Sequence, residues 1–389
     1  MPCGTRMSPA ETDLGPNEGL IEVPGSRRAL LTPALVVDLD KFETNLLRHQ
    51  RICGEAGLRM RPHAKTHKCS EIAKRQAEAG AVGVCCATLH EAEVMVGAGI
   101  DGVLITSPVV GAARIGRMIK LAGSARRFKL VADNPVNLRA ISEAAEALAQ
   151  PLEVLVDIDI GMQRTGVAAP EDAVALARMI SEAPNLTYRG VQAYSGRVQH
   201  INDLTERRQV YGEQLAHLKT VIEALGAAGL PPAIVTGGGT GSLVIDIETG
   251  IFTEHQTGSY IFMDVEYNEV SMPIAGNIPF QTSLLMQCTV VSNNADGFVT
   301  INGGYKSFAT DGPKPKVADP ELSGSIYDRF GDEHGKIVLG PGNLAPELGA
   351  PVNLITPHCD PTVNLHNYLH CVRGDKLVDI WPIDARGVL

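Results

Sequence analysis

The chain has 389 residues, of which 44% are hydrophobic, so it can bury the core of one large barrel with an appendage or of two domains. Lysine and arginine number 34 against 44 acidic residues, and the net charge of −10 argues against binding to nucleic acid or to an anionic membrane. Residues 1–28 lack the pattern of a secretion signal and no apolar run is long enough to span a membrane, so we expect a soluble cytoplasmic protein with a small-molecule ligand.

Residues 1–29 are rich in proline, glycine and acidic side chains without periodicity, which indicates an N-terminal arm to which we assign no chemistry. Over residues 30–270, short apolar runs alternate with helical patterns. The eight runs are ALVVDLD (34–40), LRMRPHAKTH (58–67), VGVCCAT (82–88), GVLITS (102–107), FKLVAD (128–133), EVLVDIDIG (153–161), RGVQAYSG (189–196) and AIVTGGGTGS (233–242). Eight such units predict an α/β fold of the TIM-type (β/α)8 barrel class. A doubly wound open sheet with an antiparallel extension also permits this alternation, but the number of units favours the barrel.

The last third, residues 271–389, changes character. Strand-like runs such as SLLMQCTVVS, GFVTING and KLVDIWPI are separated by turn residues, with little helical pattern. We therefore expect a second, mostly β C-terminal domain. The N-terminal arm contributes to this domain, and the domain carries a metal site. The eight cysteines are scattered, and the adjacent Cys85 and Cys86 would point to opposite faces of a strand, so a thiolate zinc site is not expected.

The segment RPHAKTHK, residues 61–68, ends an apolar strand-like run. On a strand His63, Lys65 and His67 would share one face, which in a barrel can be the lumen. Burial disfavours a charged lysine, and the lowered pKa makes its amine suited to imine formation. The alternative is a strand end with solvated basic residues, and the segment alone does not decide between the two.

Three further segments carry polar groups where apolar runs end. In VTGGGTGS, residues 235–242, the glycines let the backbone approach a ligand closely, and the N–H groups there can hold a phosphate. The alternative is a glycine-rich turn without a ligand. In VDIDIGMQRTG, Arg164 can hold a phenolate or carboxylate, or lie on a surface loop. In PHCDPTVNLH, His358 and Asp360 would share a strand face and bind a divalent cation with waters, while Cys359 faces away.

Together these segments resemble the D-threonine aldolase family of fold-type III pyridoxal phosphate enzymes, which is related to bacterial alanine racemase. The resemblance extends from about Thr32 to Gly387. It rests on many motifs in the same order, which is more specific than any one of them: PALVVDLD, RPHAKTHK, GVCC, DIGMQRTG, QAYSGRVQH, TGGGTGS, QTGSYIFMD, DEHG, and HCDPT followed by NLH and ARG.

The resemblance implies roles for residues at matching positions. Lys65 would bind the cofactor covalently, and Arg164 would contact its phenolic oxygen. Gly238, Gly239 and Thr240 would hold the phosphate through backbone groups, with the side chain of Tyr260 as a partner. Gln256 would face the pyridine nitrogen, where racemase-like relatives carry an arginine, and the ring would be a weaker electron sink. Tyr194 and His200 would line the pocket, and His358 and Asp360 would bind the metal.

The activity implied is retro-aldol cleavage of a D-3-hydroxy amino acid to glycine and an aldehyde, with Mn²⁺, or else Mg²⁺ or Zn²⁺, near the β-hydroxyl and His67 as the base. Related D-serine dehydratases carry His and Cys as metal ligands, so Asp360 favours the aldolase branch. The alternatives are a D-serine or D-3-hydroxyaspartate dehydratase, a 3-hydroxy-D-aspartate aldolase, and a non-catalytic pyridoxal phosphate carrier. The resemblance also implies a homodimer.

The chain departs from the aldolase relatives at three places. Ala87 and Thr88 stand where they commonly have Gln-Lys, Ser107 and Pro108 where they have Asn-Glu, and residues 302–304 read Asn-Gly-Gly where they often have Asp-Ala-Gly. These segments could shape the substrate pocket, so the sequence does not identify the substrate.

Overall fold

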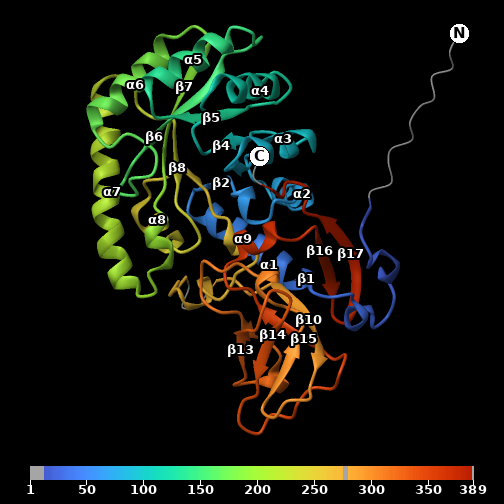
Figure 1. Ribbon diagram of the computed structural model, residues 1–389. Coiled ribbons are helices and arrows are strands. Elements are labelled where there is room, and N and C mark those ends of the chain that lie inside the picture. Colours follow the sequence, from blue (N-terminus) through green and yellow to red (C-terminus); the bar gives the residue numbers. More distant parts are fainter. Residues whose placement is uncertain (1–12, 275–278, 388–389) are drawn as a thin grey trace, which may run out of the picture.

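Eight short parallel strands form one of the two sheets in the computed structural model, which describes residues 13–274 and 279–387 (Figure 1). The strand order is β2-β9-β8-β7-β6-β5-β4-β3. Their bounds are β2 Arg59–Met60, β3 Cys85–Cys86, β4 Leu104–Ile105, β5 Lys129–Ala132, β6 Leu152–Ile158, β7 Leu186–Ala193, β8 Ile234–Gly237 and β9 Glu254–His255. A parallel bridge between His63 and Cys85 and a hydrogen bond from the N–H of Cys85 to Pro62 O join the first and last strands. The predicted parallel barrel is confirmed.

Helices follow the strands and cover the outside of this barrel (Figure 1). Their bounds are α1 Leu39–Glu55, α2 Ser70–Glu78, α3 Leu89–Gly97, α4 Ala112–Ala122, α5 Pro135–Ala145, α6 Pro170–Glu182, α7 Leu204–Ala227 and α8 Leu243–Thr249. Side-chain caps begin several of them: Thr88 accepts from the N–H of Glu91, and Asn134, followed by Pro135, accepts from the first turn of α5. These two caps each start a helix soon after a strand ends, so the loops after β3 and β5 are short.

The second sheet has nine strands in the order β13-β14-β11-β10-β1-β16-β17, with β15 pairing with β10 and β12. The bounds are β1 Ala34–Asp38, β10 Leu284–Ser292, β11 Phe298–Ile301, β12 Lys316–Val317, β13 Ile326–Arg329, β14 Gly335–Val338, β15 Pro351–Ile355, β16 Tyr368–Arg373 and β17 Lys376–Pro382, with the short helix α9 Cys359–Asn364 after β15. The predicted second, mostly β domain is confirmed.

The first predicted barrel strand belongs to this second sheet. β1 pairs antiparallel with β10 and parallel with β16, so assigning it to the barrel was wrong. Its residues Ala34 to Val37 are buried, and a continuous apolar run is equally typical of a central strand in either sheet. The eighth barrel strand is instead β9, which was not predicted because two residues show no periodicity. The boundary at residues 270 and 271 stays a prediction.

The N-terminal arm packs against the last hairpin of the β domain. The N–H of Glu22 donates to Leu377 O, and the hydroxyl of Ser26 accepts from the N–H of Leu377. The part of the arm before residue 13, including Cys3, lies outside the described residues. Within the described ranges, no helix is both long and apolar enough to cross a membrane.

Apolar side chains close the barrel lumen below its mouth. Cys85, Leu104, Val131, Leu155 and Ile234 form one buried cluster across the strands. The strands alternate, so their other buried side chains pack against the helices in the main barrel core. The filled lumen leaves the carboxyl ends of the strands as the place for a site.

Gly190 in β7 offers a test of this packing. Its φ of 135° is one that other residues rarely adopt, and a side chain there would collide with the backbone of Ile234 in β8. We expect Gly190→Ala to lower the free energy of unfolding by more than about 2 kcal/mol, measured as a shift in the denaturant midpoint. Gly212→Ala is the matched control, because nothing lies within 4 Å of the added methyl on α7, and helix propensity should make it neutral or stabilising. An unchanged midpoint for Gly190→Ala would contradict this packing.

Candidate active site

A cavity of about 270 Å³ opens at the carboxyl ends of the barrel strands. It is lined by His63, Lys65, Ala87, Thr106, Ser107, Arg164, Thr165, Gln192, Tyr194 and Gln256. Four of these were predicted site residues: Lys65, Arg164, Tyr194 and Gln256. Active sites of parallel barrels lie at this end. The cavity is therefore the candidate active site.

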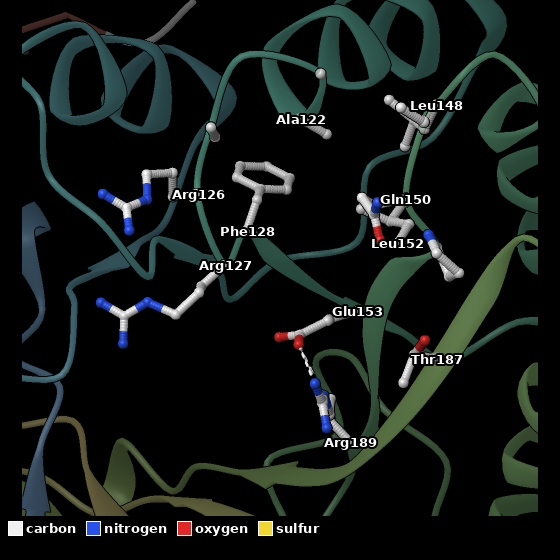
Figure 2. Close-up of a pocket in the computed structure, with 14 residues that line it drawn as sticks. Ala122, Arg126, Arg127, Phe128, Leu148, Gln150, Leu152, Glu153, Thr187 and Arg189 are labelled. Atoms are coloured by element: carbon white, nitrogen blue, oxygen red, sulfur yellow. Dashed lines mark hydrogen bonds and ion pairs between the residues drawn. The ribbon is translucent and has the colours of Figure 1, made fainter.

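A second cavity lies at the opposite end of the barrel (Figure 2). Its walls include Leu152 and Glu153 at the start of β6 and Thr187 at the start of β7. In Figure 2, Glu153 and Arg189 point toward each other and form an ion pair, while the side chains of Arg126 and Arg127 extend away from this pair. Because active sites of parallel barrels lie at the other end, we assign this cavity no catalytic role.

Lys65 lies in the short 3-10 helix Ala64–Thr66, just beyond β2, and its Nζ donates to Oδ2 of Asp360 in α9. Burial by itself lowers the pKa of Lys65, but the carboxylate of Asp360 outweighs it and raises the pKa above the usual lysine value. Burial likewise raises the pKa of Asp360, but the ammonium of Lys65 holds it well below its usual range. The predicted lowered pKa of Lys65 is therefore wrong, because the sequence did not reveal its pairing with Asp360.

His67 does not share the cavity with Lys65. A 3-10 turn replaces the strand on which His63, Lys65 and His67 were predicted to share one face, so the predicted strand was wrong, although His63 and Lys65 both line the cavity. His67 is fully buried, its Nδ1 accepts from the N–H of Cys69, and burial lowers its pKa to about 4. Its position does not suit a base that must reach a substrate.

Arg164 lies on the loop after β6, where Asp159 Oδ1 accepts from the N–H groups of Gly161 and Met162, both at 2.8 Å. The Arg164 guanidinium lies 5.6 Å from the ring centroid of Tyr194, which follows β7. Among the described residues no carboxylate pairs with Arg164. A charge at the cavity wall without a protein partner can hold an anionic group of a ligand.

Gln256 belongs to a buried chain of amides. Its Nε2 donates to Gln192 Oε1 at 3.2 Å and to Thr236 Oγ1 at 3.1 Å. Gln192 in turn donates to Asp157 Oδ1 at 2.9 Å, and burial raises the pKa of Asp157 to about 6. Gln192 and Asp157 were not predicted as site residues. Polar residues inside the buried runs RGVQAYSG and EVLVDIDIG could have indicated them, because they suggest positions that face the lumen.

The predicted phosphate loop begins directly after β8. Gly237 O accepts from the N–H of Gln256 at 2.8 Å, which places the loop beside the cavity. The N–H of Gly239 donates to the hydroxyl of Ser242 at 3.0 Å, so it does not point to a ligand as predicted. The N–H groups of Gly238 and Thr240 make no hydrogen bond to any described residue. Two backbone donors are therefore free to bind an anion.

The side chain of Tyr260 does not reach this loop. Its backbone N–H donates to the Thr240 hydroxyl at 3.0 Å, but its ring stacks on His49 with centroids 4.1 Å apart. Its hydroxyl accepts from Gln76 Nε2 at 3.3 Å, and the whole side chain is buried. The predicted phosphate contact of the Tyr260 side chain is wrong, because the 3-10 helix Ser259–Ile261 turns it into the core.

The predicted metal pair lies at the start of α9 rather than on a strand. His358 is the N-cap residue and Asp360 lies in the first turn, because β15 ends at Ile355 and the chain turns into a helix. The predicted strand was therefore wrong, but Asp360 reaches Lys65. Cys359 between them is buried, as expected.

His358 is oriented by a carboxylate. Its Nδ1 lies 2.8 Å from Asp311 Oδ2, which leaves Nε2 for a ligand. In the described part of the chain, no group of three or more His, Cys, Asp or Glu side chains is arranged to hold a metal. Two protein ligands suit a hard cation that keeps several waters, such as Mn²⁺ or Mg²⁺, better than a closed zinc site.

His200 lies next to this pair, at the end of the 3-10 helix Arg197–His200. Its ring centroid is 6.3 Å from that of His358, and its Nδ1 is 3.3 Å from Glu266 Oε2. Burial lowers the pKa of His200, although Glu266 opposes this. His200 thus stands beside the predicted metal pair with its Nδ1 close to a carboxylate.

The departures from the aldolase pattern lie partly at the cavity. Ala87 and Ser107 line it, and Ser107 with Thr165 also lines an adjoining apolar groove between α4 and α5. Asn302 is structural, since its Nδ2 donates to Thr32 O at 2.9 Å.

Family models match both halves of the chain. The alanine racemase N-terminal domain matches residues 37–266, and a putative serine dehydratase domain matches residues 283–372. The two matches fall on the barrel and on the β domain.

Individual relatives match nearly the whole chain. A D-threonine aldolase from Arthrobacter sp is 40% identical over 359 residues, covering 92% of this chain and 93% of the relative. A 3-hydroxy-D-aspartate aldolase from Paracoccus denitrificans is 33% identical, covering 97% and 99%. The crystal structure of D-threonine aldolase from Filomicrobium marinum is similar with a TM-score of 0.88 at 37% identity, covering 92% of this chain and 96% of that one.

The pairing of Lys65 with Asp360 can be tested on the lysine itself. We expect Asp360→Asn to lower the pKa of Lys65, because burial remains while the stabilising carboxylate is lost. After removal of any bound cofactor, acetic anhydride at pH 8 should then label Lys65 roughly tenfold faster per pKa unit, measured by mass spectrometry of its peptide. Asp311→Asn is the matched control, because that carboxylate contacts His358 instead. Equal labelling in wild type and Asp360→Asn would refute the pairing.

Proposed function

This chain belongs to the alanine racemase-like family of pyridoxal phosphate enzymes that includes D-threonine aldolase, and on this premise we propose that it is a lyase that cleaves D-3-hydroxy amino acids to glycine and an aldehyde. One observation carries the proposal. The contact between Lys65 at the barrel mouth and Asp360 of the β domain brings the expected cofactor lysine and the expected metal pair into one site.

The cavity residues fit pyridoxal phosphate. Lys65 would hold the cofactor covalently, the free charge of Arg164 would hold its phenolic oxygen, and the free N–H groups of Gly238 and Thr240 would hold its phosphate. Gln256 places a neutral amide near the ring. When bound, the cofactor supplies a conjugated system that accepts the electron pair released at the α-carbon of the substrate.

His358 and Asp360 fit a divalent cation, which we propose to be Mn²⁺. Covalent use of Lys65 would free Asp360 from its ammonium, and Asp311 already orients His358. Such a cation supplies positive charge beside the β-hydroxyl of the substrate.

We assign the base to His200 rather than to His67. His200 lies beside His358, and Glu266 at its Nδ1 leaves Nε2 to accept the proton of the β-hydroxyl. Tyr194 and Arg164 form the wall across the cavity, where they would restrict how the substrate turns. The chain thus provides separate groups for the cofactor, the cation and the proton.

The main alternative is a dehydratase, which would release ammonia and a keto acid. The match of the β domain to a putative serine dehydratase domain keeps this alternative open. Asp360 favours the aldolase, since the dehydratases that the chain resembles carry cysteine there. A 3-hydroxy-D-aspartate aldolase remains within the proposed reaction and differs only in substrate. A pyridoxal phosphate carrier without activity would have no use for His358 and Asp360.

We also propose that the protein is a cytoplasmic homodimer. A net charge of −10 disfavours association with an anionic membrane surface, which is compatible with this location. The resemblance supports the dimer, because in related barrels the second domain of one subunit closes the pocket of its partner.

Product analysis tests the proposed reaction. Incubation with a panel of D-3-hydroxy amino acids, pyridoxal phosphate and Mn²⁺ should yield an aldehyde and glycine in equal amounts, without ammonia. Lys65→Ala should abolish turnover and the label left by borohydride reduction, because no other lysine among the described residues lines the cavity. Lys74→Ala on the exposed side of α2 is the control and should behave as wild type. Ammonia with a keto acid would establish the dehydratase instead.

Replacing His200 tests the assignment of the base. His200→Asn should lower kcat by about 10²- to 10⁴-fold without changing the absorbance of bound cofactor. Because burial lowers the pKa of His200 and the neutral form is required, wild-type kcat/KM should fall only as the pH drops through a value below 6.5. His217→Asn on α7 is the control. Full turnover by His200→Asn would show that another residue acts as the base.

A further inference from the structure

The side chain of Gln199 is buried between two segments of the active site. Its Oε1 accepts from the N–H of Gly241 at 2.9 Å and from the N–H of Ser242 at 3.2 Å. Its Nε2 donates to Ser195 O and to the hydroxyl of Ser242, both at 3.1 Å. With 1% of its surface exposed, the amide has all of its hydrogen-bonding capacity used inside the protein.

These bonds determine which backbone donors of the phosphate loop remain free. Gln199 takes the N–H groups of Gly241 and Ser242, and the hydroxyl of Ser242 takes the N–H of Gly239. The N–H groups of Gly238 and Thr240 are left over. The amide of Gln199 and the hydroxyl of Ser242 thus occupy the N–H groups at positions 239, 241 and 242, and the two free donors are at positions 238 and 240.

The glycines of the loop make room for Gln199. A Cβ at Gly239 would lie 2.5 Å from Gln199 Oε1, and a Cβ at Gly241 would collide with Gln199 O. At Gly238 a Cβ would instead lie 2.5 Å from Asp246 Oδ2 and His255 Nε2. The glycines at positions 238, 239 and 241 are therefore required by close packing against Gln199, Asp246 and His255, whether or not a ligand binds.

Gln199 also connects this loop to the residue proposed as the base. It lies in the 3-10 helix Arg197–His200, so its neighbour in sequence is His200. Through Ser195 O it also holds the segment that follows Tyr194. A shift of the phosphate loop would therefore be transmitted to the β7 end of the site.

We propose that Gln199 is a positioning residue that sets the conformation of the loop at residues 238–242 so that the N–H groups of Gly238 and Thr240 face the cofactor phosphate. The inference rests on the proposed function, since it assumes that pyridoxal phosphate binds at Lys65. None of the residues to which the side chain of Gln199 is hydrogen-bonded lines the cavity at Lys65, so we expect the phosphate to be affected more than the ring.

Pyridoxal, which lacks the phosphate, separates this role from a general structural one. Cofactor-free wild type and Gln199→Met are titrated with pyridoxal phosphate and with pyridoxal, and the absorbance of the chromophore at Lys65 gives each Kd. We expect Gln199→Met to weaken pyridoxal phosphate binding about ten- to a hundredfold, the effect of misplaced hydrogen bonds to a charged group. The Kd for pyridoxal should change by less than about twofold.

Two further variants complete the experiment. Ser242→Ala removes the hydroxyl that Gln199 and Gly239 share, so it should show the same selective loss, and it replaces Gln199→Met if that variant does not fold. Gln150→Met is the matched control, because its exposed side chain lies at the opposite end of the barrel, where it is labelled in Figure 2.

The outcomes separate the inference from the proposed function. Wild type that binds neither aldehyde at Lys65 would overturn both. Wild type that binds both aldehydes, with variants that lose them equally or not at all, would overturn the role of Gln199 and leave the proposed function intact. A loss confined to pyridoxal phosphate supports the inference.

Discussion

The ion pair between Lys65 and Asp360 is the interaction that joins the barrel to the β domain at the active site. Each charge comes from a different domain, and the carboxylate of Asp360, whose side chain is only 12% exposed, would lack a compensating charge without Lys65. Pairing offsets part of its desolvation cost, which favours the position of the β domain that places His358 beside the barrel. The same contact therefore stabilises the fold and assembles the site, and a ligand that takes Lys65 must also compensate Asp360.

The path of the chain supports this placement. β1 lies in the centre of the second sheet, and α1, which follows it immediately, packs its Phe42 edge-to-face on Trp381 of β17 with centroids 5.6 Å apart. The chain then enters the barrel, returns to the β domain at β10, and comes back to the barrel mouth in α9. Because the chain passes between the domains more than once, neither can move far without breaking buried contacts of the other.

Sequence patterns identified seven of the eight barrel strands and the β domain, because long buried runs such as Leu152–Ile158 are distinctive. They failed where the decisive fact was a distant contact. A run like Ala34–Asp38 does not reveal which sheet it joins, and a two-residue strand such as Glu254–His255 has no period. Spacing of two residues around Lys65 and around Asp360 suggested strands, but tight helical turns place those side chains instead. The order of the motifs in the sequence thus indicated which segments form the site. Only the structure showed which of their side chains are in contact.

The orientation of Gln256 follows from a carboxylate two residues away in the chain of hydrogen bonds. Ionised Asp157 can only accept, so Gln192 must present its N–H group to it and therefore turns its carbonyl toward Gln256. Gln256 must then donate, and its two N–H groups are used by Gln192 and Thr236. Only its carbonyl oxygen remains for the cavity. A side chain that looks neutral and adaptable in the sequence is thus held as an acceptor, and this polarity originates at a buried acid whose pKa of about 6 lies close enough to neutrality to make it sensitive to pH.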